Sequence, residues 1–193
     1  MPKFLKPGPA GKNLIGRGGY SLIELLVVIV MIGILSGVIF ASSRNSPKTL
    51  SLDRSAQKAN QDISQARGMA MGGYLATCTV GGPVNGYGIF FSTASPSQYL
   101  VYANCDADNK YSASLDKQIG NSLSLESGVS VSSLKTGVSG TATTSISIFF
   151  LPPDPILYTN GTARVTSSVV LSVSGLSQTK TLNVSGSGIV NVK

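Results

Sequence analysis

The chain has 193 residues, of which 42% are hydrophobic but only 12% charged, and its formal net charge is +7. The charged fraction is about half the ~25% of average globular proteins, and together with many Ser, Thr and Gly residues it favours an exported, β-rich domain over a cytosolic enzyme. The absence of histidine excludes Ser-His-Asp and Cys-His catalytic sites. Because no cluster of His, Cys or carboxylate residues is evident either, we expect no enzyme activity, no metal centre and no cofactor.

Residues 1–19 form a basic segment rich in glycine and proline, without an apolar stretch that could build a core. Its four charges are all positive, so the chain from Tyr20 onward keeps +3 of the net charge of +7. The excess charge is therefore mostly a topology signal, because positive residues stay on the cytoplasmic side of a membrane helix. A secretory signal peptide carries its apolar region before the cleavage site, whereas here the apolar region follows Gly19.

Residues 20–41 predict a membrane-spanning helix. At ~1.5 Å per residue the helix would be about 33 Å long, which matches the ~30 Å hydrocarbon core of a bilayer. Glu24 is the one acidic residue in this run, and the next charge is Arg44. A carboxylate in a low dielectric must be paired or protonated, so Glu24 invites a functional explanation. Gly33 and Gly37 would let another helix approach closely.

Residues 42–73 predict an amphipathic helix that follows a bend near Pro47, because the residue before a proline is pushed out of the helical conformation. We expect the helix to end near Gly72 and Gly73. Its apolar residues recur at helical spacing, namely Leu52, Ala56, Ala59, Ile63, Ala66 and Ala70. The seam spans under three heptads, so packing against a sheet is favoured over a coiled coil.

Residues 74–193 change to a period of two, which predicts a β-rich head. The predicted fold class is α+β: a long N-terminal helix, membrane-spanning in its first half and amphipathic in its second, packed on a C-terminal antiparallel β-sheet or sandwich. The candidate strands are 75–80, 86–91, 99–103, 122–125, 129–134, 145–151, 165–173, 179–184 and 189–192. Cys78 and Cys105 form a candidate disulfide in an oxidising compartment, the alternative being two buried free thiols.

The stretch Gly19-Tyr20-Ser21-Leu22-Ile23-Glu24, followed by its apolar run, resembles the N-terminus of type IV pilins and type II secretion pseudopilins. The departure is Tyr20, where the family most often has phenylalanine. The resemblance implies leader cleavage between Gly19 and Tyr20, N-methylation of the Tyr20 amine, and pairing of Glu24 with the N-terminal amine of a neighbouring subunit to set the axial register. The alternatives are a simple turn at Gly19 and an interfacial acid at Glu24.

Three further segments look like the GspH/FimT-type minor pseudopilins, namely 63–70, 87–91 and 148–152. The resemblance implies a minor subunit of a type IV pilus or a type II secretion pseudopilus. Its partners would be other pilin or pseudopilin subunits in a helical filament, the prepilin peptidase and methyltransferase, the inner-membrane assembly platform, and membrane lipid. The chain would be a single-pass cytoplasmic (inner) membrane protein with its head outside the cytoplasm, and after assembly part of an extracellular or periplasmic filament.

Two alternatives in other classes are a DNA-binding minor pilin for DNA uptake and a single-pass surface protein outside any filament. DNA binding would need a basic patch with aromatic residues. The loose candidates are Lys110, Tyr111 and Lys117 in the head, and Arg44, Lys48, Arg54 and Lys58 near the amphipathic helix.

Asn104, Asp106 and Asp108 have the spacing of half a calcium loop, but they lack the glycine and the distal glutamate of an EF-hand, so the sequence predicts a solvated turn.

Overall fold

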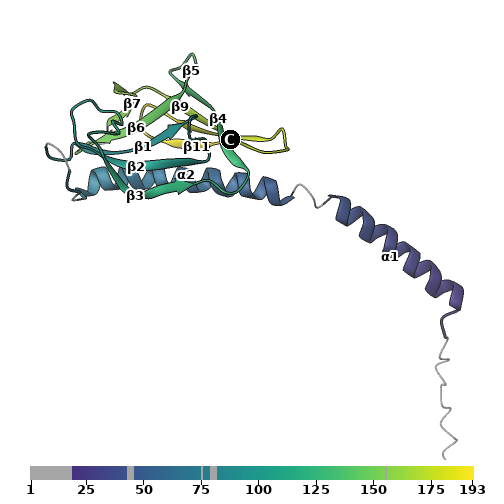
Figure 1. The fold of residues 1–193 in the computed structure, drawn as a ribbon. Helices are drawn as coiled ribbons and strands as arrows, with labels where there is room; N and C mark the ends of the chain where they lie inside the picture. Colours follow the sequence, from purple (N-terminus) through teal and green to yellow (C-terminus); the bar gives the residue numbers. More distant parts are fainter. Residues whose placement is uncertain (1–18, 43–45, 75, 79–81, 155) are drawn as a thin grey trace, which may run out of the picture. The chain divides into compact units, whose positions relative to one another are not determined.

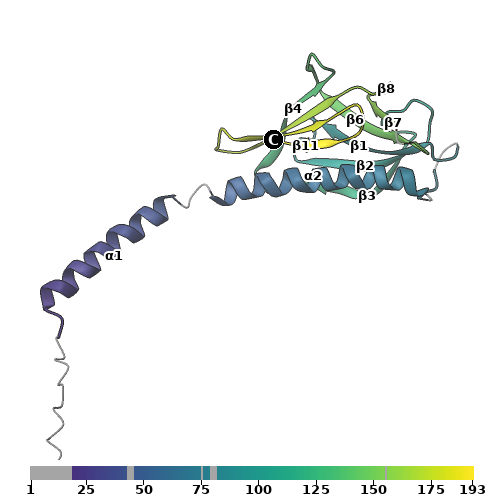
Figure 2. The ribbon, with the colours of Figure 1, turned by 180° about the vertical axis from the view of Figure 1, so that it is seen from behind.

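A computed structural model describes residues 19–42, 46–74, 76–78, 82–154 and 156–193 (Figures 1 and 2). The chain divides into two compact units, Met1–Arg44 and Asn45–Lys193, which are described separately. The first unit holds one helix, and the second holds a helix and two antiparallel sheets. The predicted α+β architecture is therefore confirmed.

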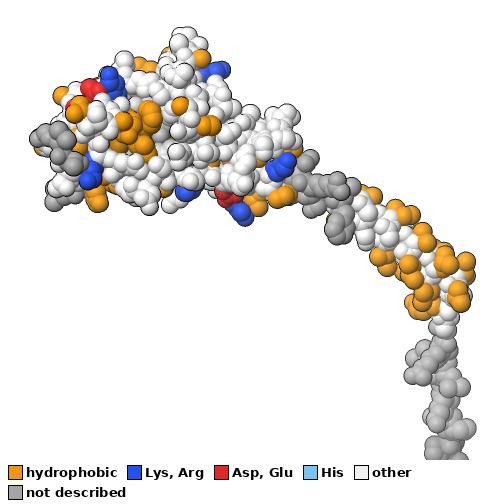
Figure 3. All heavy atoms as spheres, viewed as in Figure 1, with side chains coloured by type: hydrophobic (Ala, Val, Ile, Leu, Met, Phe, Trp, Pro, Cys, Tyr) orange, Lys and Arg blue, Asp and Glu red, His pale blue; other side chains and the backbone are white. Residues whose placement is uncertain are grey.

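Helix α1 (Leu22–Ser42) is built almost entirely from apolar residues. Its large hydrophobic side chains from Leu22 to Ile39 are exposed within the chain, from 44% at Val27 to 85% at Leu22. Figure 3 shows these side chains along the whole helix. By length and composition α1 could cross a membrane, with Leu22–Ile39 as the candidate span.

Helix α2 (Ser46–Gly72) begins with Pro47 in its first turn, where the missing N–H would have had no partner in any case. The bend predicted just before it falls partly on residues 43–45, which lie outside the described residues. The helix ends as expected: Gly73 has φ +62, and the Tyr74 N–H donates to the Met69 carbonyl at 3.3 Å. This is the hydrogen bond of a glycine-based C-terminal cap.

One stripe of α2 faces the head and is fully buried. The predicted seam is confirmed at all its six positions, each at most 2% exposed: Leu52, Ala56, Ala59, Ile63, Ala66 and Ala70. Four of the six are alanines, so the helix axis can lie close to the strands. Polar contacts hold the same helix at its sides, because the Tyr99 hydroxyl donates to Asp62 at 2.6 Å and Lys180 pairs with Asp53 at 2.9 Å.

The head contains two sheets whose paired strands are all antiparallel. The first has the order β3-β2-β1-β6-β7-β8 and the second β11-β10-β9-β4-β5. The strands of the first are β1 (Gly86–Ser92), β2 (Gln98–Asn104), β3 (Lys117–Ser124), β6 (Ser145–Leu151), β7 (Ile156–Thr159) and β8 (Thr162–Ala163). Those of the second are β4 (Val129–Thr136), β5 (Thr141–Thr143), β9 (Ser167–Val173), β10 (Thr179–Val184) and β11 (Val190–Val192).

A single hydrophobic core lies between α2 and both sheets. Helix α2 contacts β1 and β6 of the first sheet and β4, β9, β10 and β11 of the second. Both views show α2 running along one side of the strands (Figures 1 and 2). Alternate residues of each strand supply the core, as in β9, where every second residue from Ser167 to Val173 is buried.

The opposite face of the first sheet carries a second, aromatic cluster. Tyr102 and Phe149 are fully buried there, and they flank Gly88 in the strand register. A Cβ at Gly88 would lie 2.6 Å from the Tyr102 ring, so only glycine leaves room for that ring. Tyr111, from the segment after β2, covers the cluster, with its ring centroid 4.6 Å from Phe90 and 5.1 Å from Tyr102.

Several predicted strands need correction. The candidate strand at 75–80 is wrong at residues 76–78, which are not in a strand. Its other residues, 75, 79 and 80, lie outside the described residues. The physical reason is that β1 is already paired on both sides, by β2 and β6. Strand β3 starts five residues earlier than predicted, on the polar edge of its sheet, and the short strands β5, β7 and β8 had not been predicted.

Candidate functional site

The start of α1 is capped by its own sequence. Ser21 precedes the first helical residue, and its Oγ accepts the Glu24 backbone N–H at 3.3 Å. Its carbonyl oxygen accepts the N–H groups of Glu24 and Leu25 at 3.1 and 3.2 Å. Serine at the N-cap with glutamate three residues later is the sequence pattern of a capping box. The serine half of that box is formed here, so Ser21 fixes where the helix begins.

The residues just before the helix are open. Tyr20 is 83% exposed, and a Cβ added at Gly19 would meet nothing within 4 Å. The Gly19–Tyr20 peptide bond is thus uncovered by the described part of the chain. An enzyme that cuts at this bond would need such access.

Glu24 is the only acidic residue in the first turn of α1. Its side chain is exposed, and in the part of the chain that the structure describes its carboxylate has neither an ion pair nor a hydrogen bond. Near a helix N-terminus a carboxylate interacts favourably with the helix dipole, which is a local role. Helix α1 itself contains no Lys or Arg, so it offers no counter-charge to this carboxylate.

A disulfide joins Cys78, in the segment after α2, to Cys105, directly after β2. The two Cα atoms lie 5.8 Å apart. This cross-link fixes one end of the segment 105–116, which folds over the aromatic face of the first sheet. Both candidate cysteines are therefore paired with each other in the structure.

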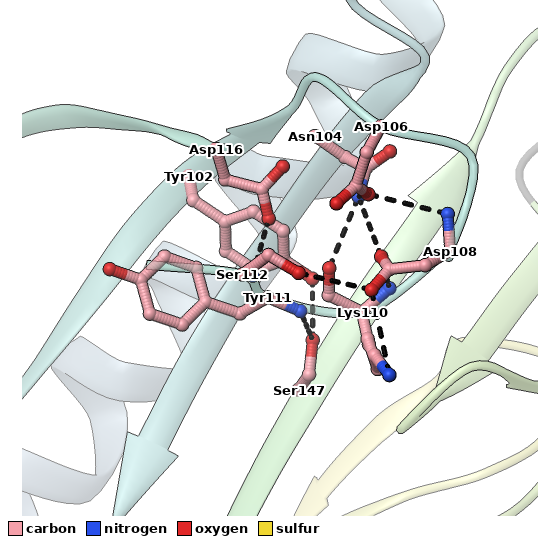
Figure 4. A network of polar contacts seen from close by, with 9 residues as sticks. All are labelled: Tyr102, Asn104, Asp106, Asp108, Lys110, Tyr111, Ser112, Asp116 and Ser147. Atoms are coloured by element: carbon pink, nitrogen blue, oxygen red, sulfur yellow. Dashed lines mark hydrogen bonds and ion pairs between the residues drawn. The ribbon is translucent and has the colours of Figure 1, made fainter. Parts of the chain in front are cut away.

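The segment 104–116 is held by a network of polar contacts, shown in Figure 4. Asp116 closes the segment, since its Oδ1 accepts the Cys105 N–H at 2.8 Å and its Oδ2 accepts the Ser112 N–H at 2.7 Å. Burial raises the pKa of the Asp116 carboxyl, partly offset by these two N–H donors. Ser147 holds the middle, because its Oγ accepts the Tyr111 N–H at 3.0 Å and lies 2.5 Å from the Tyr102 hydroxyl.

The basic residues considered for nucleic-acid binding have other contacts in the head. Lys110 pairs with Asp108 at 3.6 Å, and the ring of Tyr111 is stacked in the aromatic cluster rather than presented for bases. Lys48 and Lys58 donate to the carbonyls of Ser174 and Ser124, at 3.1 and 3.4 Å.

Arg44 lies outside the described residues. Tyr111, the one aromatic residue among the described candidates, therefore has its ring packed in the cluster and not free to stack on a base.

Residues 16–40 match the family model described as the prokaryotic N-terminal methylation motif. The matched stretch contains Gly19, Tyr20 and Glu24, and it extends along α1 to its last turn. Neither a curated protein nor a solved structure matches the chain. The match supports a type IV pilin-like precursor that is processed and methylated at its N-terminus, and with it a structural rather than a catalytic role.

Sequence reasoning missed two features of these sites. The first is Ser21 as the N-cap, for which the Ser-x-x-Glu spacing was an available signal. The second is Asn104, for which the sequence predicts only a solvated turn, whereas its amide lies at the centre of the 104–116 network. Its burial at the end of a strand is a tertiary feature that no local pattern shows.

Proposed function

We propose that the protein is a structural subunit of a type IV pilus or a type II secretion pseudopilus. A prepilin peptidase removes residues 1–19 and methylates the Tyr20 amine. The mature chain is held in the inner membrane by α1, with its β-rich head outside the cytoplasm, until the assembly platform adds it to a helical filament. We further propose that it is a minor subunit. The support is the sequence resemblance of residues 63–70, 87–91 and 148–152 to minor pseudopilins.

One observation carries this proposal: an apolar helix, exposed on all sides, bears a single unpaired carboxylate in its first turn, five residues after an open glycine. A free-standing anchor needs no such charge. A carboxylate at this depth is costly in lipid unless it is neutralised. The Tyr20 amine of a neighbouring subunit would supply the opposite charge at the same depth, which explains why a lone acid is present.

Such a pair specifies geometry more surely than it adds stability. When two copies of α1 lie side by side, only one axial offset brings the amine of one copy to Glu24 of the other. The remaining contacts between the two helices are apolar and tolerate sliding. Glu24 would therefore set the register of the filament, while the apolar surface supplies the attraction.

The processing step is tested by mass spectrometry of the protein purified from its native membrane. The N-terminal peptide is expected to begin at Tyr20 and to carry one N-methyl group. A protein that still begins at Met1, or an unmethylated Tyr20, would contradict the proposal and favour a simple single-pass surface protein. Gly19→Val should block the cut, because a Cβ-branched side chain crowds the peptide bond.

The register role is separated from the capping role by Glu24→Gln. Glutamine also serves at the third position of a capping box, so the variant keeps the helix start but loses the charge. It is expected to insert in the membrane normally and to be recovered in filaments at least tenfold less than the wild type. The control is Glu126→Gln, which changes the chain's other glutamate, an exposed residue of the head. Normal incorporation of Glu24→Gln would refute the register role.

The minor-subunit role is tested by counting copies. Quantitative mass spectrometry of purified filaments should find this chain far below the most abundant pilin. If it forms the bulk of the filament, it is a major subunit. A salt-dependent gel shift of the full chain in detergent with duplex DNA tests the DNA-uptake alternative, for which we expect no shift at physiological salt.

A further inference from the structure

The segment that follows β2 places oxygen atoms at alternating positions. Asn104, Asp106 and Asp108 supply side-chain oxygens, Lys110 supplies its carbonyl, and Ser112 its hydroxyl. This spacing is that of the first nine positions of a calcium-binding EF-hand loop. Spacing and acidity alone do not make a cation site, so the argument depends on how these groups are paired.

The amide of Asn104 is the unusual group. Asn104 is fully buried, and its Nδ2 lies among three oxygens: Asp106 Oδ1 at 3.1 Å, Asp108 Oδ1 at 3.4 Å and the Lys110 carbonyl at 3.1 Å. Figure 4 shows the contacts of this nitrogen to Asp108 and to Lys110, with Asp106 directly in front of it. An amide nitrogen has two protons, so three acceptors share them.

The other end of the same amide has no partner. Asn104 Oδ1 is buried and makes no hydrogen bond. A buried acceptor without a partner is costly, and native structures rarely tolerate one without a reason. Three acceptors therefore surround Nδ2 of this amide, while its Oδ1 has no donor.

A cation resolves both problems at once. Rotation of the Asn104 amide by half a turn would bring Oδ1 to face Asp106 Oδ1, Asp108 Oδ1 and the Lys110 carbonyl. Four oxygens would then surround one point, a repulsive arrangement without a positive charge and a favourable one with it. The three oxygens now lie 3.1–3.4 Å from the nitrogen at their centre. After the rotation Oδ1 would take the place of this nitrogen, and the ion would lie between the four oxygens. Oxygens that lie 2.3–2.6 Å from a calcium ion, at right angles to one another, are about 3.3–3.7 Å apart, so the present separations need little change.

We propose that this loop binds a Ca²⁺ ion through Asn104 Oδ1, the carboxylates of Asp106 and Asp108 and the carbonyl oxygen of Lys110. The Ser112 hydroxyl and water complete the six to eight oxygens that calcium takes. Two carboxylates with neutral oxygens at irregular spacing suit calcium better than magnesium, which demands a near-ideal octahedron. The site lies outside the α1 segment and is independent of the proposed filament role.

The loop is shaped for this role before the ion arrives. Asn109 has φ +54, so it takes the left-handed conformation that glycine supplies at the sixth position of an EF-hand. The disulfide at Cys105 and the two hydrogen bonds of Asp116 fix the ends of the segment. The missing glycine noted in the sequence is therefore compensated by Asn109.

The missing distal glutamate is not compensated, and it sets the expected affinity. Leu115 stands at the twelfth position, and among the described residues no three His, Cys, Asp or Glu side chains lie together as metal ligands. Lys110, whose side chain is 54% exposed, also competes by pairing with Asp108. With two carboxylates we expect a dissociation constant of roughly 10⁻⁴ to 10⁻³ M, the range of extracellular calcium modules.

The test uses Tb³⁺, which replaces Ca²⁺ and emits when a nearby aromatic ring is excited. The chain has no tryptophan, so emission would come through tyrosine, and Tyr111 directly follows the Lys110 carbonyl. The full chain in detergent is titrated with Tb³⁺ and then with Ca²⁺ or Mg²⁺. We expect sensitised emission that millimolar Ca²⁺ displaces and equal Mg²⁺ does not. No sensitised emission, or emission insensitive to Ca²⁺, would overturn the proposal.

Three variants make the test specific. Asp106→Asn keeps an acceptor oxygen but loses the charge, so it should weaken Ca²⁺ binding at least tenfold. The control Asp154→Asn removes an exposed carboxylate outside the loop and should leave the Ca²⁺ affinity unchanged. Asn104→Asp adds a third carboxylate, so it should bind Ca²⁺ about tenfold more tightly.

The melting temperature of Asn104→Asp should fall in EDTA and recover in Ca²⁺. A variant that is destabilised equally in both buffers, or an Asp106→Asn chain that binds like the wild type, would show a structural loop only.

Discussion

The disulfide between Cys78 and Cys105 should supply a large share of the stability of the head. It closes a loop with a sequence separation of 27 residues. On the chain-entropy model, a cross-link of this length stabilises the folded state by about 3.5 kcal/mol at 25 °C. That is a change of roughly 400-fold in the unfolding equilibrium. Whole domains are stable by only about 5–15 kcal/mol, so reduction should bring the head close to its threshold.

The assay is urea unfolding of the full chain in a mild detergent, followed by near-ultraviolet circular dichroism of the tyrosines. Tyr99 and Tyr102 are buried, so this signal reports the packed head and not α1. With a urea m-value of about 1–3 kcal/mol/M, reduction should lower the midpoint by about 1.2–3.5 M. The double variant Cys78→Ser/Cys105→Ser should match the reduced wild type, and a reductant should not move it further. Equal midpoints for the oxidised and reduced wild type would refute the reasoning.

Two further outcomes follow from the packing of the head. Ala59→Leu inserts a larger side chain where α2 is fully buried, so it should lower the free energy of unfolding of the head by about 1–3 kcal/mol in the same urea assay. The control Gln65→Leu lies on the exposed face of the same helix and should change that free energy by no more than about 0.5 kcal/mol. Burial raises the pKa of Tyr99 and of Tyr102 well above the ordinary value of about 10. The folded head then holds protons that the unfolded chain releases, so its stability is complete below pH ~10 and falls as the pH rises further. Phenolate absorbance should show Tyr99 and Tyr102 ionising only as the head unfolds. Ionisation of this buried pair at pH 10 in a folded head would contradict the reasoning.

The helices and the long strands could be predicted because each obeys one period over many residues. The six-residue seam of α2 was complete in the sequence, and β6 and β10 begin and end where their alternation does. The candidate strand at 75–80 failed for a non-local reason. It has the composition of a strand, but a strand needs a free edge, and the neighbouring β1 is paired on both sides.

The cation loop could be predicted only in part. The alternating oxygens at Asn104, Asp106 and Asp108 are a local pattern, and the sequence shows them. Two other features do not show in the local pattern. One is the left-handed backbone conformation of Asn109, at the position where an EF-hand has glycine, and the other is the hydrogen bond that Asp116 accepts from the Cys105 N–H. The decisive orphan atom, Asn104 Oδ1, depends on the burial of the loop against a sheet.

The composition of the two helices indicates where lipid should give way to water. The exposed apolar residues of α1 follow one another around its whole circumference, so no face of it suits water. Helix α2 has one apolar stripe, which its own head covers, and charged residues such as Asp53 and Arg54 on its other faces. In the proposed membrane-anchored state, we therefore expect the boundary between lipid and water to fall between the end of α1 at Ser42 and Asp53. In the proposed filament, only α1 would need neighbouring subunits to replace lipid, so the assembly contacts should concentrate there.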